Sequence, residues 1–446
     1  MNNSIKFATS ALALGVGLAL SAPAYAGGFY IQEQSTKEAG RAYSGDAAAA
    51  DSAATVFFNP AGMTELEGIT IEANAQALFV DARQSNTGTT RTVPGVPVAI
   101  PVSGSDGGNP FAQPLVIPSF YATAQVTDRL WLGLGVNSPF GVVVDYDEDF
   151  FGRYDSLKSD VFTVNVQPSA AYKLSENISI GAGVDVQYVD VELANAVPNL
   201  NPADADAALN IQGDDITVGW NAGITATFNP VRIGAHYRSS IDHTLEGDFD
   251  LSGLTGPLAG NNVVTSATAP LSTPDIATVS VMFGTDTPYR VYGTWRWYNW
   301  SNFNEIRVQP EGAPTQVSEQ NYRDTYSMAI GAEYDFSERF TLRAGTMFDE
   351  SPITDEFRTT RVPDGDRTWL SVGPWTRRLA TAPRISKPAS ATPQWPTTRT
   401  LPGWTTRSEK CWSGSPPWAC GSERSSCTSR TTAGTRPPTF SRPDGA

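Results

Sequence analysis

The chain has two histidines, His236 and His243, which lie on one predicted strand. A catalytic triad needs a base held next to a nucleophile, and neither histidine has a nucleophile motif beside it. Residues 27–373 contain no cysteine, which argues against a thiolate zinc site or a disulfide framework there. The sequence therefore predicts no enzyme, no catalytic residue, no metal site and no cofactor. Both histidines are expected to be ordinary strand positions.

The predicted strand Leu130 to Val144 contains a proline and a glycine, Pro139 and Gly141. A proline within a strand removes a ladder hydrogen bond, and lipid cannot replace that bond if the strand crosses a membrane. We therefore expect a kink formed by Asn137, Ser138, Pro139, Phe140 and Gly141. A plain β-bulge is the alternative.

A second backbone constraint lies at Asn59, Pro60 and Ala61. Proline fixes its own φ and biases the residue before it away from helix, so this tripeptide predicts a fixed turn. The turn is either a rigid elbow near a binding path or a simple loop before the first strand.

The elements that position these residues are strands. From Ile69 onward, stretches of about ten to fifteen residues alternate apolar and polar side chains, as expected of strands with two different faces. Clear examples are Ile69 to Phe79, Ile178 to Tyr188, Ile216 to Phe228 and Tyr326 to Phe336. Soluble β-sandwiches also alternate, so this pattern alone does not place the chain in a membrane.

The connections between the strands alternate between short and long. Short turns are predicted at 127–129, 174–177, 229–230, 285–288 and 337–338, and long polar stretches at 84–114, 145–160, 195–213, 248–273, 304–321 and 350–365. Outer-membrane barrels have this arrangement, with tight periplasmic turns and large external loops. Eleven strands are predicted from Ile69 to Phe348, and a twelfth begins near Asp366. Trp295, Trp297, Tyr298 and Trp300 are expected in an aromatic girdle or in core packing.

Residues 1–26 have the features of an export signal. Lys6 precedes the apolar run Ala8 to Leu20, and Ala24-Tyr25-Ala26 is a small-residue cleavage site, so the mature chain is expected to begin at Gly27. The formal net charge of -15 argues against a nucleic-acid partner. The fold class predicted is an all-β transmembrane antiparallel barrel in the outer membrane of a Gram-negative cell.

Several motifs in the chain resemble those of the FadL family, the outer-membrane transporters of long-chain fatty acids and hydrocarbons. They include Gly27 to Ser35, Gly40 to Gly45 and Phe58-Asn59-Pro60-Ala61-Gly62-Met63, followed by Gly135 to Gly141, Gly152-Arg153-Tyr154, Tyr237-Arg238-Ser239, Trp297 to Ser301, Arg323-Asp324-Thr325 and Pro363 to Leu370. The resemblance covers residues 27–373.

The resemblance implies a fourteen-stranded barrel (68–373) whose lumen is plugged by an N-terminal hatch (27–67). It implies a monomer that binds a hydrophobic small molecule, releases it through an opening in the wall and contacts outer-membrane lipid. The hatch would contain the elbow at Asn59, and the kink at Asn137 to Gly141 would form the lateral exit. Arg153, Arg238 and Arg323 are then candidates for binding a ligand carboxylate, or are salt-bridge partners within the lumen.

Residues 374–446 do not continue this pattern. They hold eleven Lys and Arg but three acidic residues, whereas the preceding part holds twenty Lys and Arg and forty-three acidic residues. All three cysteines, Cys411, Cys420 and Cys427, lie here, and alternation is lost. We interpret this tail as the product of a frameshift near Gly373, with a disordered basic extension as the alternative.

The leading functional interpretation is uptake of hydrophobic ligands, most of all long-chain fatty acids. A general porin or a surface adhesin is the alternative, and neither needs a hatch. An outer-membrane enzyme such as a lipase has no visible support among the residues.

Overall fold

The computed structural model describes residues 27–93, 96–111, 114–201, 203–338 and 340–376. These residues belong to a compact unit that ends at Ala380. The predicted export signal and the predicted aberrant tail lie outside the described residues, apart from 374–376, the first three residues of the tail.

The N-terminal segment, residues 27–67, contains short helices between turns. Ser35 caps the first of them by accepting a hydrogen bond from the Glu38 amide. Asn59 caps the last, which starts with Pro60, a position where the missing N–H costs no hydrogen bond. The helices are α2 (Thr36–Ala39), α3 (Asp46–Ala49), α4 (Thr55–Phe58) and η1 (Pro60–Glu65). Within the described residues, no helix is long and apolar enough to be a candidate membrane span.

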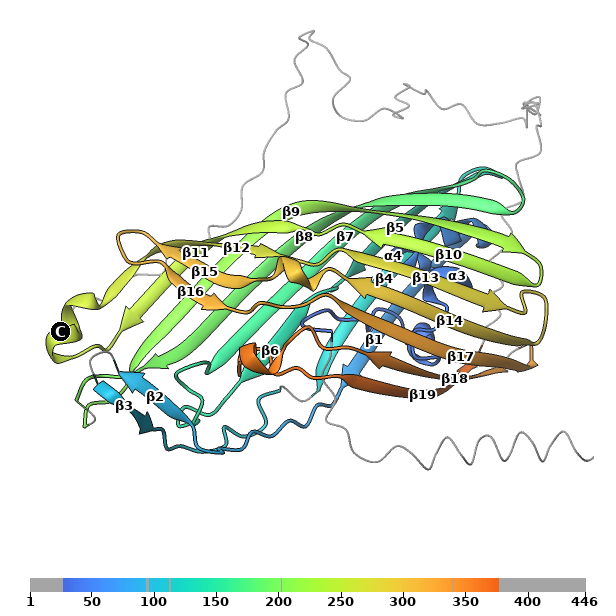
Figure 1. The fold of residues 1–446 in the computed structure, drawn as a ribbon. Helices are drawn as coiled ribbons and strands as arrows, with labels where there is room; N and C mark the ends of the chain where they lie inside the picture. The colour runs from blue at the N-terminus through green and yellow to red at the C-terminus, as the bar shows by residue number, and fades with distance from the viewer. Residues whose placement is uncertain (1–26, 94–95, 112–113, 202, 339, 377–446) are drawn as a thin grey trace, which may run out of the picture. The chain divides into compact units, whose positions relative to one another are not determined.

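The rest of the unit consists of antiparallel strands (Figure 1). They are β1 (Ile69–Leu78), β2 (Thr90–Val93), β3 (Val96–Pro101), β4 (Leu115–Gln125), β5 (Leu130–Asn137), β6 (Gly141–Asp145), β7 (Lys158–Lys173), β8 (Ile178–Val197), β9 (Ala207–Phe228), β10 (Val231–Arg238), β11 (Asp242–Ser252), β12 (Val263–Ser272), β13 (Ile276–Phe283), β14 (Tyr289–Tyr298), β15 (Glu305–Pro310), β16 (Gln316–Glu319), β17 (Thr325–Ser337), β18 (Phe340–Asp349) and β19 (Arg367–Thr376). Three further 3-10 turns are η2 (Gly256–Asn261), η3 (Trp300–Asn302) and η4 (Asp355–Phe357).

The strands form an up-and-down series in chain order, in which each crossing pairs with the next. Five crossings are interrupted and consist of β5 with β6, β10 with β11, β12 with β13, β14 with β15, and β16 with β17. The described residues therefore make twelve crossings, which confirms the predicted number and the antiparallel fold class. The series runs from β1, which pairs with β4, to β19, which pairs with β18.

The predicted short turns are confirmed, and together they define one end of the sheet, the turn end. The opposite end, the loop end, differs from the prediction. The stretches 195–213 and 248–273 were expected to be loops, yet β8 continues to Val197, β9 starts at Ala207, and β11 continues to Ser252. These residues extend the strands because they keep the period of two, with apolar side chains on the inner face.

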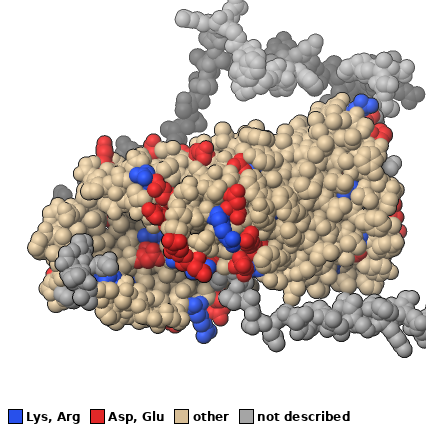
Figure 2. Space-filling model, viewed as in Figure 1, with Lys and Arg blue, Asp and Glu red and all other residues tan. Residues whose placement is uncertain are grey.

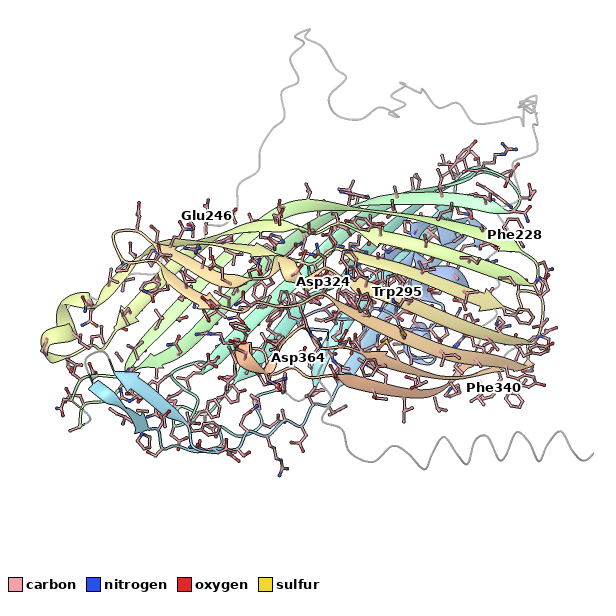
Figure 3. All side chains as sticks on the ribbon, viewed as in Figure 1. Phe228, Glu246, Trp295, Asp324, Phe340 and Asp364 are labelled. Carbon is pink, nitrogen blue, oxygen red and sulfur yellow. The ribbon has the colours of Figure 1, made fainter. Side chains whose placement is uncertain are left out.

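Charged side chains gather over the part of the visible face that carries β11, β12, β15 and β16, and are scarce over β10, β13 and β14 (Figure 2). Phe228 and Phe340 lie near the turn end, and Glu246 lies near the loop end (Figure 3). The predicted aromatic girdle is only partly correct. Trp295 faces outward and stacks on Tyr326, whereas Tyr298 and Trp300 are fully buried in the core around the N-terminal segment.

Candidate ligand-binding site

The inner face of β8 is polar near the turn end and apolar near the loop end. Near the turn end, its buried residues are small or polar, for example Gly181, Asp185 and Gln187. From Val189 to Leu193 the buried residues are apolar, and acidic residues between them face outward. The inner surface of the barrel therefore becomes apolar at the loop end.

This apolar surface borders a cavity that is partly open to solvent and has about 810 Å³ of empty space, the open part included. Its wall comes from strands β6 to β9, β11, β12 and β15, and Phe29 of the N-terminal segment also contributes to it. Most lining side chains are aliphatic or aromatic, among them Val191, Leu193, Leu245, Ile306 and Phe303. A hydrocarbon chain would be removed from water here, at a gain of about 0.8 kcal/mol for each methylene.

Arg361 is the single charged residue among those that line the cavity. It lies in the connection between β18 and β19, and its Nη2 donates a hydrogen bond to Asn195 Oδ1 at 3.0 Å. Its Nη1 is buried and has no hydrogen-bond partner among the described residues. Burial lowers the pKa of this guanidinium from its ordinary value, and nearby Asp155 opposes that shift. A carboxylate in the cavity would supply the missing acceptor and a countercharge.

Arg361 was not among the arginines predicted from the sequence to bind a carboxylate. It lies two residues before Pro363, where one of the family-like motifs begins, and therefore outside any motif that could have indicated it. Arg361 and Asn195 lie 166 positions apart in the sequence, so the contact that places Arg361 at the cavity depends on the tertiary fold.

The structure places the three arginines proposed from the sequence elsewhere. Arg153 bridges outer connections, with Nε 2.8 Å from Asp206 Oδ2 and Nη1 3.0 Å from the Ser103 carbonyl oxygen. Arg323 is half exposed, and its Nη2 lies 3.0 Å from Glu350 Oε1. Neither residue lines the cavity, so their role in carboxylate binding stays a prediction.

Arg238 lies deeper in the lumen and holds the N-terminal segment. It forms a buried ion pair with Asp185, and its Nη2 donates to the Phe57 carbonyl oxygen at 3.0 Å. The guanidinium also lies over the Phe57 ring, at 4.5 Å from the ring centre. These contacts assign Arg238 to packing of the N-terminal segment against the wall.

Asn59, the residue predicted to form an elbow, is fully buried between the N-terminal segment and the wall. Its Nδ2 donates to the carbonyl oxygens of Ala47 at 2.8 Å and Ile224 at 3.1 Å, and its Oδ1 accepts from the Ala61 amide at 3.1 Å. A Cβ on Gly223 would lie only 2.1 Å from Asn59 Oδ1. The elbow fits because glycine leaves room for it on β9.

Other ion pairs fix the N-terminal segment at several points along the lumen. Arg41 Nη1 lies 2.7 Å from Glu333 Oε1 on β17. Asp46 pairs with Arg296 on β14, and Glu65 pairs with Arg232 on β10. The helix α3 accordingly packs against β10 and β13, whereas α4 packs against β4, β5 and β7 (Figure 1).

The wall is interrupted at the predicted kink. Ser138 to Phe140 separate β5 from β6 and lie opposite Thr163 and Val164 of β7, since Asn137 pairs with Asn165 and Gly141 with Phe162. Three residues facing two make a bulge on this side. On the other side, the pairing of β4 with β5 ends at Val136, and no pairing joins β4 to β6 within the described residues.

The N-terminal segment takes the place of β4 beside the kink. The Ile31 amide donates to the Pro139 carbonyl oxygen at 2.8 Å, and the Gly141 amide donates to the Phe29 carbonyl oxygen at 2.9 Å. The Gln34 side-chain amide donates to the Ser138 carbonyl oxygen at 2.7 Å. Residues of the N-terminal segment therefore satisfy part of the kink. Thr163 of β7 satisfies Phe140, because its Oγ1 accepts from the Phe140 amide at 3.1 Å and donates to the Phe140 carbonyl oxygen.

A second cavity, also partly open and with about 630 Å³ of empty space including the open part, lies in the wall between β4 and β6. Its lining is mostly apolar and includes Ile31, Ile117 and Val143. Val142 and Val161 line both this wall cavity and the lumen cavity. The two spaces are thus neighbours at the kink; Phe29 lines the lumen cavity and Ile31 lines the wall cavity.

The two histidines lie on the inner face of the strands. His243 lies between Asp215 Oδ2, at 2.9 Å from Nδ1, and Gln187 Oε1, at 3.1 Å from Nε2. His236 is buried near Arg238 and Arg296. Within the described part of the chain, no group of three or more His, Cys, Asp or Glu residues could hold a metal ion.

Comparisons with known proteins agree with this architecture. Residues 17–377 match the family described as outer membrane protein transport protein (OMPP1/FadL/TodX). The chain is 30% identical to the 47 kDa outer membrane protein of Pasteurella multocida, covering 84% of this chain and 89% of the relative. It is 27% identical to the long-chain fatty acid transport protein of Escherichia coli O6:H1, covering 84% and 88% of the two chains.

Two solved structures share the fold. The Pseudomonas aeruginosa FadL homologue superposes with a TM-score of 0.66 at 23% identity, covering 80% of this chain and 88% of that one. The Ralstonia pickettii toluene transporter TbuX gives a TM-score of 0.51 at 18% identity, covering 73% and 93%.

Proposed function

The chain belongs to the outer membrane protein transport protein family (OMPP1/FadL/TodX), and from this premise we propose that it takes up long-chain fatty acids. It is a Gram-negative outer-membrane transport protein and not an enzyme. The proposed route has three parts, which are the lumen cavity, the hatch formed by residues 27–67 and an exit through the wall at the kink.

The observation that carries the proposal is an apolar cavity with one basic group, Arg361, whose Nη1 has no hydrogen-bond partner in the described part of the chain. A long alkyl chain gains free energy against the apolar lining, and the carboxylate would bind Arg361. A charge-assisted hydrogen bond contributes about 1.5–3 kcal/mol, which corresponds to roughly ten- to 150-fold in affinity. The cavity therefore favours an amphipathic anion over a neutral hydrocarbon of equal length.

The hatch supports lateral release. Ion pairs and the Asn59 elbow fix residues 41–65 in the lumen, so a passage straight to the turn end would require several buried contacts to break. The lumen cavity and the wall cavity share the lining residues Val142 and Val161, while Phe29 lines the first and Ile31 the second. We therefore place the exit at Asn137, Ser138, Pro139, Phe140 and Gly141.

The test is a comparison of two ligands that differ in the head group. Binding of oleate and of oleyl alcohol is measured on the purified full chain and on its Arg361→Met and Arg361→Lys variants. We expect Arg361→Met to weaken oleate binding about tenfold or more and to leave oleyl alcohol binding nearly unchanged, while Arg361→Lys retains part of the affinity. Arg307→Met is the matched control, because Arg307 lies beside cavity residue Ile306 but pairs with Glu305 instead of lining the cavity.

Three outcomes would contradict the proposal. Equal losses for both ligands would assign Arg361 a structural role. Tighter binding of the alcohol than of oleate by the unmodified chain would favour a neutral hydrocarbon ligand. Permeation of small hydrophilic solutes through the chain would favour the general porin.

A further inference from the structure

The lumen cavity and the wall cavity differ in whether they offer a countercharge to a carboxylate. Arg361 lines the lumen cavity, where it is held beside Asn195 of β8. Among the described residues that line the wall cavity, none is charged. Its polar lining residues are Asn137 and Ser138, and the others are apolar. A carboxylate therefore finds a cation in the lumen cavity and none in the wall cavity.

The two cavities meet at some distance from Arg361. Val142 and Val161, which line both cavities, pair with each other, and Val161 also pairs with Val191 of β8. From Val191 to Asn195, the partner of Arg361, an extended strand covers about 13 Å. An alkyl chain with C–C bonds of about 1.5 Å rises by about 1.25 Å per carbon, so roughly ten carbons cover this distance. A ligand bound through its carboxylate to Arg361 therefore presents its tail at the junction.

The kink lies at the level where β8 changes its apolar face. Asn137 and Gly141, on either side of the kink, are connected through β7 to Gln187 and Asp190 of β8. We expect this level to be the outer boundary of the bilayer. A fatty acid in a bilayer keeps its carboxylate at the boundary and its tail inside, because burial of a charge is costly. A ligand that points its tail toward the kink already has this orientation.

We propose that the ligand leaves the lumen tail first, so that its ω end enters the wall cavity while its carboxylate is still bound to Arg361. The proposal rests on the proposed function and specifies the substrate class. The substrates are amphipathic anions whose tail is longer than roughly ten carbons and has no polar group at the ω end. Shorter acids bind Arg361 but do not reach the junction.

The opposite order, with the carboxylate leading, is opposed by the lining of the wall cavity. The carboxylate would leave Arg361 before any of the tail had entered an apolar environment outside the lumen. Asn137 Nδ2, which is buried and has no hydrogen-bond partner among the described residues, offers a neutral donor but no countercharge. In the tail-first order, burial of the methylene groups provides the gain in free energy before the ion pair with Arg361 is given up.

The first test locates the two ends of the bound ligand. Two hexadecanoic acid probes, one with a diazirine beside the carboxyl group and one with a diazirine at the ω end, are irradiated on the purified full chain. Peptide mass spectrometry identifies the labelled residues. We expect the ω probe to label the wall cavity, at Ile117 or Val143, and the other probe to label the surroundings of Arg361, such as Val362. An ω-labelled octanoic acid should label the lumen cavity alone.

Two variants serve as controls for the labelled positions. Val143→Trp should remove labelling of the wall cavity by the ω probe and preserve labelling near Arg361 by the other probe. Val186→Trp, on the outward face of β8, should change neither pattern. Labelling of the wall cavity by the carboxyl-end probe, or by neither probe, would overturn the tail-first order while leaving binding at Arg361 intact. If excess oleate competed with no labelling at all, the proposed function itself would be contradicted, and this proposal with it.

The second test compares two isomers that carry a hydroxyl group at opposite ends. The 2-hydroxy and 16-hydroxy derivatives of hexadecanoic acid have the same composition and chain length. Binding to the full chain is measured for each, together with uptake into vesicles with and without the chain. Per bound ligand, we expect the 16-hydroxy acid to be taken up at least about fivefold more slowly, because its leading end carries a hydroxyl group into an apolar cavity. Equal rates for the two isomers would refute the tail-first order.

Discussion

The two parts of β8 differ in which face is apolar. From Ile178 to Tyr188 the outward side chains are apolar and the inward ones are small or polar. From Val189 to Leu193 the inward side chains are apolar, and the outward residues between them are Asp190 and Glu192. The first part has the N-terminal segment on its inner side, and the second has the apolar cavity there. We expect lipid outside the first part and water outside the second.

Alternation and its phase therefore carry separate information. Alternation identifies a strand, and the phase tells which face avoids water. A change of phase within one uninterrupted strand marks the level at which the strand leaves the bilayer. In this chain the apolar cavity begins at the same level.

The largest effect on folding and membrane insertion is expected where the sheet ends, at β19. We predict that resequencing the gene across the codon for Gly373 and translating all three frames will reveal a frame that continues both the alternation and its phase. The corrected chain should fold and insert into membranes, whereas the chain as given should leave the outer edge of β19 without a partner, which lipid does not tolerate. Heat-modifiable gel migration of both products is the measurement, and insertion of the present chain alone would refute the prediction.

The next largest effect is expected on folding stability, at the buried polar contacts between the N-terminal segment and the part of the wall near the turn end. Arg238→Met should destabilise the fold by about 3–5 kcal/mol, because Asp185 would keep a buried charge without a partner. Arg153→Met, at an ion pair between outer connections, should cost about 1 kcal/mol or less. Urea unfolding of the detergent-solubilised chain measures both. Adding Asp185→Asn to Arg238→Met should recover part of the loss, and equal losses for the two arginines would contradict the comparison.

The outward faces of the two parts of β8 can be compared with a matched pair of substitutions to arginine. Val184→Arg should lower the free energy of unfolding by about 2–4 kcal/mol, since its side chain faces lipid. Asp190→Arg, also outward but beyond the change of phase, should have little effect. Folding into lipid vesicles provides the measurement. Similar effects at both positions would mean that the change of phase does not mark the membrane boundary.

The smallest effect is expected at the kink, where the two parts meet. Val143→Trp should fill the wall cavity and lower oleate uptake severalfold while leaving binding in the lumen cavity nearly unchanged. Val186→Trp, which faces outward on β8, is the control and should transport normally. Loss of binding together with uptake would argue that the wall cavity is not a separate exit.

Much of the fold could be predicted because each strand is recognisable from residues that are close together in the sequence. Period-two alternation and the positions of short turns gave the crossings from Ile69 to Thr376, and Pro139 marked the interruption of the third one. The loop-end parts of β8, β9 and β11 were mistaken for loops, since their outward Asp and Glu residues resemble loop composition. The candidate site was harder to predict from the sequence. Arg153, Arg238 and Arg323 lie in recognisable motifs, while Arg361 does not.

Export, membrane crossing by antiparallel strands and a backbone defect at Asn137 to Gly141 were all predictable from the amino-acid sequence. These properties depend on residues close together in the chain. The folded structure was needed to show that Arg361 reaches the cavity, that Phe29 and Ile31 cover the defect, and that Gly27 lies close to Asp349. Those contacts join residues more than a hundred positions apart, and their distances follow from barrel curvature and side-chain packing, which no local pattern encodes.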